Sequence, residues 1–357
     1  MSVTEGPKKV VREEARTMNT VLSALKQPKS SPKGTSARVE VRGRSVSSRA
    51  LAVYLQLTVR PFLTVWSKAP GLPWPMGLVD YAGMLVPPLK GTEYRSVMLA
   101  ECEAEWIRAE GVGNDRVVLY LHGGAFVCCG LNTHRRLTSR VSHSVDAPVL
   151  SVDYRMMPRN PISHAVEDGV DGYRYLLDSG YRPDQIFIAG DSAGGYLAFM
   201  VALMLRDLDL PTPAGIVTMS PLTNMDPTGK LEHDNASRCA VFPAGAVPAL
   251  TMLADRVDAR IVVEGTRGPR VSPVDADLTG LPPVLIQAGS TEIVLADAEL
   301  MADRLVAAGV DCELQVWQDQ VHVFQAADFL PEAQHALRTI GQFVRSRSAI
   351  RFAQDSA

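Results

Sequence analysis

Residues 186–200 read IFIAGDSAGGYLAFM. A short apolar run leads into GDSAGG at 190–195, after which apolar residues return at helical spacing. The pattern predicts a buried strand, a sharp turn at Ser192 and a helix that begins directly behind it. Side chains two residues before and after the serine would collide across such a turn, so we expect glycine to be required at both places.

The same stretch also has a purely structural interpretation, in which a glycine-rich turn joins strand to helix and the serine or the aspartate caps the helix. The chemical interpretation requires partners. A serine hydroxyl is a weak nucleophile unless a base accepts its proton and an acid orients that base. In hydrolases built on such a sheet, the acid and then the base follow the serine along the chain.

Two histidines, His322 and His335, lie beyond residue 234. His322 is in the loop QDQVHVF after the last predicted strand, whereas His335 lies within a predicted amphipathic helix, which favours a surface position. The acid is expected after the preceding strand, where VLIQAGSTEIVLAD offers Glu292 and Asp297. Glu292 is nearer to the strand end, so we predict a triad of Ser192, Glu292 and His322, with Asp297 as the alternative acid.

A second glycine-rich turn follows the apolar strand VVLYL, where residues 122–126 read HGGAF. Small residues let the main chain approach a substrate carbonyl, and backbone N–H groups there can stabilise an oxyanion. We predict an oxyanion hole formed by Gly123, Gly124, Ala125 and Ala193. The HGG sequence alone indicates only a turn, but several elements in the right order, each at the end of a predicted strand, favour a catalytic site.

Strand and helix patterns alternate along most of the chain after residue 93. This alternation predicts an α/β fold with a mostly parallel eight-stranded sheet and helices on both faces. A polar, irregular segment at about 225–270 interrupts the alternation and is expected to be a cap insertion. We assign 46–90 to N-terminal cap helices and 91–350 to the catalytic domain.

Composition limits the classes of function. The chain has 357 residues, 46% of them hydrophobic and 21% charged, and a net charge of −3, which shows no overall preference for nucleic acid. No apolar run reaches the length of a membrane span, and no secretory leader is evident, so we expect a cytoplasmic protein. The five cysteines lack the spacing of a zinc site, and we expect no metal and buried free thiols at Cys102, Cys128, Cys129, Cys239 and Cys312.

Charge is uneven along the chain. Residues 1–45 hold ten Lys/Arg and four Glu, and we expect a basic, poorly ordered tail. The alternative is a tail that contacts anionic lipid or another envelope polymer. The apolar segment 49–69, which contains Trp and Phe, predicts one or two helices that pack on the domain or form a lipid-facing lid.

Taken together, residues 90–345 resemble the hormone-sensitive-lipase-like family of α/β-hydrolases, bacterial esterase family IV. The motifs are HGGAF, VDYRMMPRNPISHAVEDG, GDSAGGYLA, SPVDADLTGLPPVLIQAGSTE and VWQDQVHVFQ, and the segment 272–297 resembles actinobacterial members. The resemblance implies an α/β-hydrolase fold with Ser192 as nucleophile, His322 as base and Glu292 as acid. It also implies that the oxyanion donors are the N–H groups of Gly124, Ala125 and Ala193 and that His122 holds their loop by hydrogen bonding.

The sequence departs from the family pattern at three places. Ala125 replaces the third glycine of HGGG, which keeps the N–H but adds a methyl group that narrows the acyl pocket. Many members carry aspartate at the position of Thr291 or use aspartate as the triad acid, whereas only Glu292 is available at this point in the chain. Arg159 follows Pro158 where glutamate is common.

The resemblance implies a serine carboxylic ester hydrolase that forms an acyl-enzyme on short- to medium-chain esters and needs no cofactor. The alternatives are a lipase acting on longer chains, an amidase or peptidase, and a non-catalytic ligand-binding protein on the same fold, as in plant gibberellin receptors. The expected partners are an ester substrate, a lipid surface contacted weakly through the N-terminal region and a second copy of the chain, with no nucleic acid.

Overall fold

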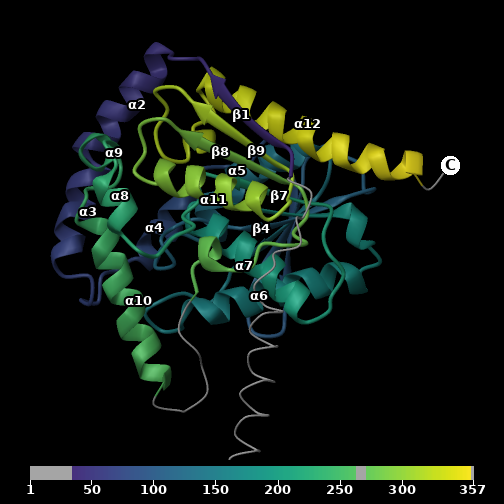
Figure 1. Cartoon of the computed structure of the whole chain (residues 1–357), viewed down its shortest axis with the longest axis horizontal. Coiled ribbons are helices and arrows are strands. Elements are labelled where there is room, and N and C mark those ends of the chain that lie inside the picture. The colour runs from purple at the N-terminus through teal and green to yellow at the C-terminus, as the bar shows by residue number, and fades with distance from the viewer. Residues whose placement is uncertain (1–33, 263–270, 355–357) are drawn as a thin grey trace, which may run out of the picture. The chain divides into compact units, whose positions relative to one another are not determined.

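A nine-stranded sheet organises the part of the chain that the computed structural model describes, residues 34–262 and 271–354 (Figure 1). The strands lie in the order β1-β9-β8-β7-β6-β4-β5-β3-β2, and only β3 runs opposite to the others, antiparallel to both of its neighbours β2 and β5. The bounds are β1 Ser36–Val41, β2 Glu93–Met98, β3 Glu103–Arg108, β4 Val117–Leu121, β5 Val149–Val152, β6 Ile186–Asp191, β7 Gly215–Met219, β8 Val284–Gly289 and β9 Cys312–Trp317.

The sheet corrects two expectations at its edge. It has nine strands rather than eight, and the added strand, β1, lies inside the 1–45 segment expected to be a poorly ordered tail. Residues 36–41 pair in parallel with β9, from Ser36 beside Cys312 to Val41 beside Trp317. The sequence SARVEV alternates, but its charged residues face solvent at the edge, so composition grouped it with the basic tail. Residues 1–33 lie outside the described part of the chain.

Helices cover both faces of the sheet. The apolar core on one face includes side chains of α6, α7 and α11, and the core on the other face includes side chains of α5 and α12. The bounds are α5 Leu131–Val145, α6 Ile162–Asp178, α7 Ala193–Asp207, α11 Leu295–Ala307 and α12 Pro331–Gln354.

Strand β4 shows why this layering follows from the sequence. All five of its side chains are buried, as in a strand covered on both sides. Because side chains alternate along a strand, Leu119 and Leu121 join the core beneath α6 and α7, whereas Val118 and Tyr120 join the core beneath α5 and α12. Tyr120 is therefore directed toward α5.

A second group of helices comes from the two segments predicted to form a cap, and we refer to them as the cap helices. They are α2 Val46–Leu57, α3 Val59–Lys68, α4 Gly77–Gly83, α8 Thr228–Glu232, α9 Asn235–Arg238 and α10 Ala246–Val262. The segment predicted as one or two helices is two, which meet at Thr58. Figure 1 shows α2, α3 and α10 along one side of the molecule, and α3 contacts α10 directly. The cap therefore combines the N-terminal helices with the insertion. Within the described ranges, no helix is long and apolar enough to cross a bilayer.

Candidate active site

The turn at Ser192 is held in a strained conformation. Ser192 joins β6 to α7 with φ 52° and ψ −117°, a region that non-glycine residues rarely occupy. A Cβ atom on Gly190 would lie 2.3 Å from the Gly194 carbonyl oxygen, and one on Gly194 would lie 1.9 Å from the Leu121 carbonyl oxygen. Both glycines are therefore needed so that β4, β6 and α7 can approach closely enough to present the serine.

The structure brings the three predicted triad side chains into one hydrogen-bonded chain. His322 Nε2 lies 2.9 Å from Ser192 Oγ, and His322 Nδ1 lies 2.6 Å from Glu292 Oε2. Glu292 is fully buried, and its other oxygen accepts the backbone N–H of Gly289 at 2.6 Å. This arrangement favours the tautomer with a proton on Nδ1, which leaves the Nε2 lone pair facing the serine hydroxyl.

The alternative acid and the second histidine have other contacts. Asp297 pairs with Lys230 Nζ at 2.9 Å and accepts the backbone N–H groups of Thr223 and Asn224, so it anchors the segment that follows β7. The ring of His335 packs edge-on against Trp317. Among the described residues, neither of these two side chains forms a hydrogen bond with Ser192.

The predicted oxyanion loop follows β4, and one of its members is reassigned. The N–H of Gly123 donates to Asp191 Oδ1 at 3.0 Å, so it is not free for a substrate oxygen. Gly123 anchors the loop instead. The N–H groups of Gly124 and Ala125 have no acceptor among the described residues, and Ala193 is the first residue of α7, where helix N–H groups lack an intrahelical partner. These three remain the candidate donors.

The loop backbone is unusually tight. Gly124, Ala125 and Phe126 all have positive φ, at 119°, 54° and 60°. A Cβ atom on Gly124 would lie 2.0 Å from the Cys128 carbonyl oxygen, so glycine is required there. Ala125 carries its methyl group in a conformation that favours glycine, which is the structural consequence of the substituted third glycine.

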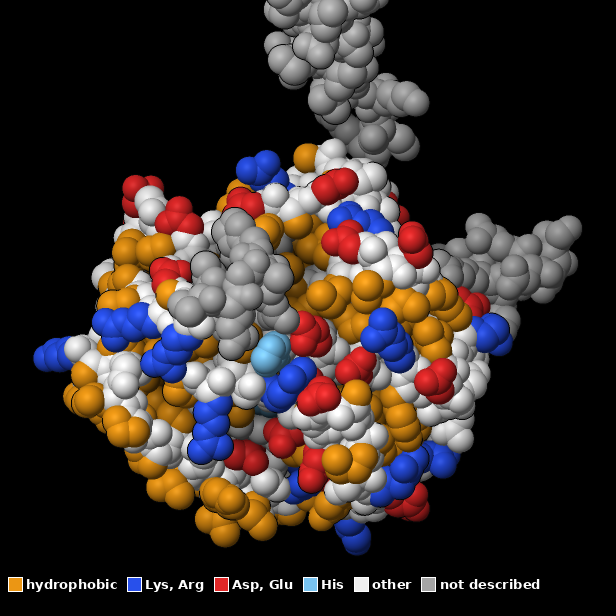
Figure 2. All heavy atoms as spheres, turned by 90° about the horizontal axis from the view of Figure 1, so that it is seen from below, with side chains coloured by type: hydrophobic (Ala, Val, Ile, Leu, Met, Phe, Trp, Pro, Cys, Tyr) orange, Lys and Arg blue, Asp and Glu red, His pale blue; other side chains and the backbone are white. Residues whose placement is uncertain are grey.

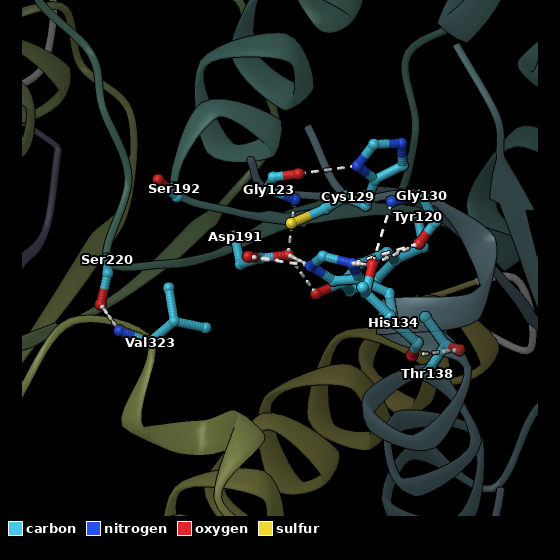
Figure 3. A network of polar contacts seen from close by, with 12 residues as sticks. Tyr120, Gly123, Cys129, Gly130, His134, Thr138, Asp191, Ser192, Ser220 and Val323 are labelled. Atoms are coloured by element: carbon cyan, nitrogen blue, oxygen red, sulfur yellow. Dashed lines mark hydrogen bonds and ion pairs between the residues drawn. The ribbon is translucent and has the colours of Figure 1, made fainter. Parts of the chain in front are cut away.

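A buried ion pair lies beneath the loop (Figure 3). His134, from α5, places Nε2 3.3 Å from Asp191 Oδ1, which also accepts the Tyr120 hydroxyl at 2.7 Å. Burial lowers the pKa of His134, but the negative charge of Asp191 and the hydrogen bond to it outweigh burial and raise that pKa to about 9. Burial likewise raises the pKa of Asp191, and the His134 charge with the hydrogen bonds from His134 and Tyr120 lowers it overall. The pair is therefore charged at neutral pH.

His122 helps to shape the same loop without carrying charge. Its Nδ1 lies 2.7 Å from the Gly123 carbonyl oxygen, and its ring stacks on Tyr154 at a centroid distance of 4.2 Å. Burial, and then the positive charge of His134, lower the pKa of His122 to about 4. The loop-holding role that the family resemblance implies for His122 fits this geometry.

Sequence reasoning missed Asp191, His134 and Tyr120. Asp191 had been considered only as a possible helix cap within the glycine-rich turn. The available signal was a carboxylate directly after the buried strand IFIAG, because a charge in that position needs a buried partner.

The site opens into a cavity of about 580 Å³. Ser192, His322 and the oxyanion loop form its floor, and side chains of the cap form its walls. The wall residues are predominantly apolar and come from both cap segments; Phe242 of the insertion packs edge-on against the His322 ring at a centroid distance of 4.8 Å. They include Tyr54, Val59, Phe62, Leu63, Trp66, Val241, Phe242, Val247 and Leu250. Such a cavity suits a small, mainly apolar ligand. The described residues contain no cluster of His, Cys, Asp and Glu arranged to hold a metal ion.

Comparisons with known proteins identify the family of the chain. Residues 118–326 match the family model described as alpha/beta hydrolase fold. The chain is 42% identical over 321 residues to the carboxylesterase/phospholipase LipF of Mycobacterium tuberculosis, covering 88% of this chain and 86% of that protein. It is 45% identical over 294 residues to the esterase LipU of the same organism, covering 81% and 99%.

Solved structures give the same result. A crystal structure of EstE5 soaked with p-nitrophenyl butyrate superposes with a TM-score of 0.75 and 34% identity, covering 86% of this chain and all of that chain. An esterase from the bacterial hormone-sensitive lipase family superposes with a TM-score of 0.73 and 33% identity, with the same coverage. The chain therefore belongs to the α/β-hydrolase family, among the serine ester hydrolases of its hormone-sensitive-lipase group.

Proposed function

We propose that Ser192, His322 and Glu292 are the catalytic triad of this esterase and that it turns over through an acyl-enzyme on Ser192. The observation that carries the proposal is the continuous contact from Glu292 through His322 to Ser192 Oγ, at 2.6 and 2.9 Å, beside two N–H groups that have no acceptor among the described residues. A base within hydrogen-bonding reach and an orienting carboxylate are the parts that serine activation requires.

In the first half-reaction, Ser192 Oγ attacks the ester carbonyl carbon while His322 Nε2 accepts the hydroxyl proton. The carbonyl oxygen becomes an oxyanion, which the N–H groups of Gly124, Ala125 and Ala193 stabilise together with the positive end of α7. Glu292 stabilises the imidazolium that has formed. The carbonyl re-forms as the alkoxide leaves, and that alkoxide takes the proton from His322, which gives free alcohol and an acyl group on Ser192.

In the second half-reaction, His322 Nε2 takes a proton from a water molecule that attacks the acyl carbonyl. The same N–H groups stabilise the second oxyanion. Ser192 Oγ leaves and receives the proton back from His322, which releases the carboxylic acid. Every proton and electron pair is carried by substrate, water and the named side chains, so the cycle requires no cofactor.

The cavity supports short- to medium-chain acyl esters as substrates. Its volume of about 580 Å³ lies in the usual range for small-molecule sites, and its apolar walls suit an alkyl chain. The alternative is action on longer lipid esters. The relative LipF, which is named a carboxylesterase/phospholipase, supports this alternative.

The test is hydrolysis of p-nitrophenyl esters from acetate to palmitate by the wild type and by Ser192→Ala. We expect a rate maximum at short or medium chains and, for the variant, loss of at least about 10³-fold in kcat. Ser237→Ala is the matched control, because Ser237 is an exposed serine on α9. A maximum at long chains would support the lipase alternative. Ester binding without turnover by folded wild type would contradict the proposal and favour a ligand-binding role.

A further inference from the structure

Three helices of the cap bury few of their apolar side chains completely, although Leu51, Ala52 and Leu55 of α2 are partly buried against the core. The only buried residue is Ser48 in α2, Trp66 in α3 and Gly83 in α4. A surface helix in a water-soluble domain usually turns its apolar stripe toward the core. The helices α2, α3 and α4 instead leave much of theirs uncovered by the described part of the chain.

The exposed apolar side chains are concentrated in this region. Of the 22 large apolar residues that are exposed in the described residues, 13 fall between positions 46 and 86. Figure 2 shows hydrophobic side chains along the left edge of its face, the side on which Figure 1 draws α2, α3 and α10. Exposed apolar side chains concentrated in one region are typical of an interaction site. The 13 are Val46, Val53, Tyr54, Leu57, Phe62, Val65, Leu72, Leu78, Val79, Tyr81, Met84, Leu85 and Val86.

The charged side chains of residues 46–92 are all positive, except for one aspartate that bonds to α5. Between positions 46 and 92 the sequence has a single carboxylate, Asp80, and four cations, Arg49, Arg60, Lys68 and Lys90. Asp80 accepts hydrogen bonds from the Thr133 backbone N–H and the Asn132 side chain, at 2.9 and 2.7 Å, so it is engaged with α5. Within the segment 46–92, exposed apolar side chains, four basic residues and a single carboxylate already bonded to α5 complement an anionic lipid surface.

The same surface continues into the cavity that contains Ser192. Tyr54, Phe62 and Val79 are exposed on the cap and also line that cavity. A protein partner seated on these side chains would cover the entrance through which an ester must pass. A lipid surface would instead present ester substrate at the entrance, so the location of the patch favours lipid.

We propose that α2, α3 and α4 form a docking surface for anionic lipid bilayers, around the entrance to the Ser192 cavity. The benefit of docking, which is the presentation of ester substrate at the cavity entrance, rests on the proposed function. Binding to the bilayer is measured separately from ester hydrolysis. The competing occupant is a second copy of the chain, joined through the same apolar side chains.

The test is co-flotation of the full chain with vesicles of phosphatidylcholine alone or mixed with phosphatidylglycerol. The variant Leu57→Gln/Leu85→Gln removes two strongly exposed leucines that do not line the cavity. The matched control, Leu208→Gln/Leu300→Gln, changes two exposed leucines outside the cap. We expect the wild type and the control to float with phosphatidylglycerol vesicles, and we expect the cap variant to partition about tenfold less, because each leucine loses its transfer free energy.

Hydrolysis of the water-soluble ester p-nitrophenyl butyrate, measured in the same preparations, separates the two proposals. Retained hydrolysis in the cap variant with lost flotation supports docking and shows that the variant is folded. Hydrolysis by a wild type that does not float would overturn docking and leave the proposed function intact. Flotation without hydrolysis by the wild type would support docking while contradicting the proposed function.

Two further outcomes would also overturn the inference. One is equal flotation of the cap variant and the control. The other is a wild type that sediments as a dimer and does not float, together with a cap variant that sediments as a monomer, which would assign the surface to a second copy. Equal binding to neutral and anionic vesicles would contradict the role given to Arg49, Arg60, Lys68 and Lys90.

Discussion

The backbone of Ser192 stores strain of about 1–3 kcal/mol, which its neighbours hold in place. The Ser192 N–H donates to the Met219 carbonyl at 2.9 Å, and the Ser192 carbonyl accepts the Leu222 N–H at 3.0 Å. These bonds join the turn to the end of β7 and the segment after it. The backbone of the proposed nucleophile is thus held by main-chain hydrogen bonds.

Glu292→Gln tests the choice of acid. Glutamine keeps the size of the side chain but removes the charge that orients His322 and stabilises its protonated form. We expect kcat for p-nitrophenyl butyrate to fall about 10³- to 10⁴-fold, with little change in the circular dichroism spectrum. The measurement is steady-state kinetics on purified variant.

Asp297→Asn is the matched control for that substitution. It leaves Lys230 buried without its partner charge, so we expect the free energy of unfolding to fall by about 3–5 kcal/mol. The kcat of the protein that remains folded should change far less than in Glu292→Gln. A larger loss of kcat in Asp297→Asn than in Glu292→Gln would reverse the assignment of the acid.

Ala125→Gly tests the strain in the oxyanion loop. With φ at 54°, alanine occupies a region that glycine adopts without penalty. We expect the variant to gain about 0.5–1 kcal/mol in urea unfolding, since relief of strain exceeds the added entropy of the unfolded chain. Ala50→Gly in the exposed part of α2 should instead lose about 1 kcal/mol. Equal losses at both positions would show that the loop is not strained at Ala125.

Most of the candidate site residues could be predicted from their places in the sequence. The assignment of Gly123 could not, for a structural reason. Ser192, Glu292 and His322 each follow a strongly apolar strand, so their positions were readable from pattern and order. Gly123 was assigned wrongly because its N–H is taken by Asp191, a residue 68 positions away. Such pairings depend on which strands are neighbours, which periodicity does not reveal.

At the scale of elements, the His134–Asp191 pair joins α5 to the end of β6 beneath the loop that follows β4. Through Asp191, it fixes the Gly123 N–H and the Tyr120 hydroxyl. Gly124 and Ala125 follow Gly123 directly, so the orientation of their N–H groups depends on this buried charge. We therefore expect His134 and Asp191 to act as positioning residues, through the loop.

The pair makes stability depend on pH. The pKa of His134 is raised in the folded state to about 9, against about 6.5 when unfolded, so the stabilisation is complete below pH 6.5 and is lost as the pH rises through 9. We expect the free energy of unfolding of the wild type to fall over this window, by an amount on the order of 3 kcal/mol from this group. Urea unfolding at a series of pH values measures it.

His134→Gln removes the titrating group and serves as the comparison. The variant should be less stable at pH 6 because Asp191 stays buried without a counter-charge. Its stability should change less between pH 6.5 and 9 than that of the wild type. Parallel pH profiles for the two proteins would contradict the assignment of the charged pair.

For the whole molecule, the alternation of strand and helix patterns predicted the sheet. The edge strand β1 and the exposed side chains of the cap were harder to predict. The sequence pattern did not predict β1, because an edge strand needs no continuous apolar run. The cap helices were visible as helices, but which of their side chains stay exposed depends on packing against the insertion. That packing leaves the cavity apolar and joins it to the outer surface at Tyr54, Phe62 and Val79.

The central claim is that Ser192 carries the acyl group, and the most direct test is peptide mass mapping after treatment with an alkyl fluorophosphonate. This reagent forms a stable phosphonyl bond with an activated serine. We expect one phosphonyl group per chain, located on Ser192, with loss of ester hydrolysis in proportion to labelling and no labelling of Ser192→Ala. Labelling of a different residue, or undiminished hydrolysis by fully labelled enzyme, would contradict it.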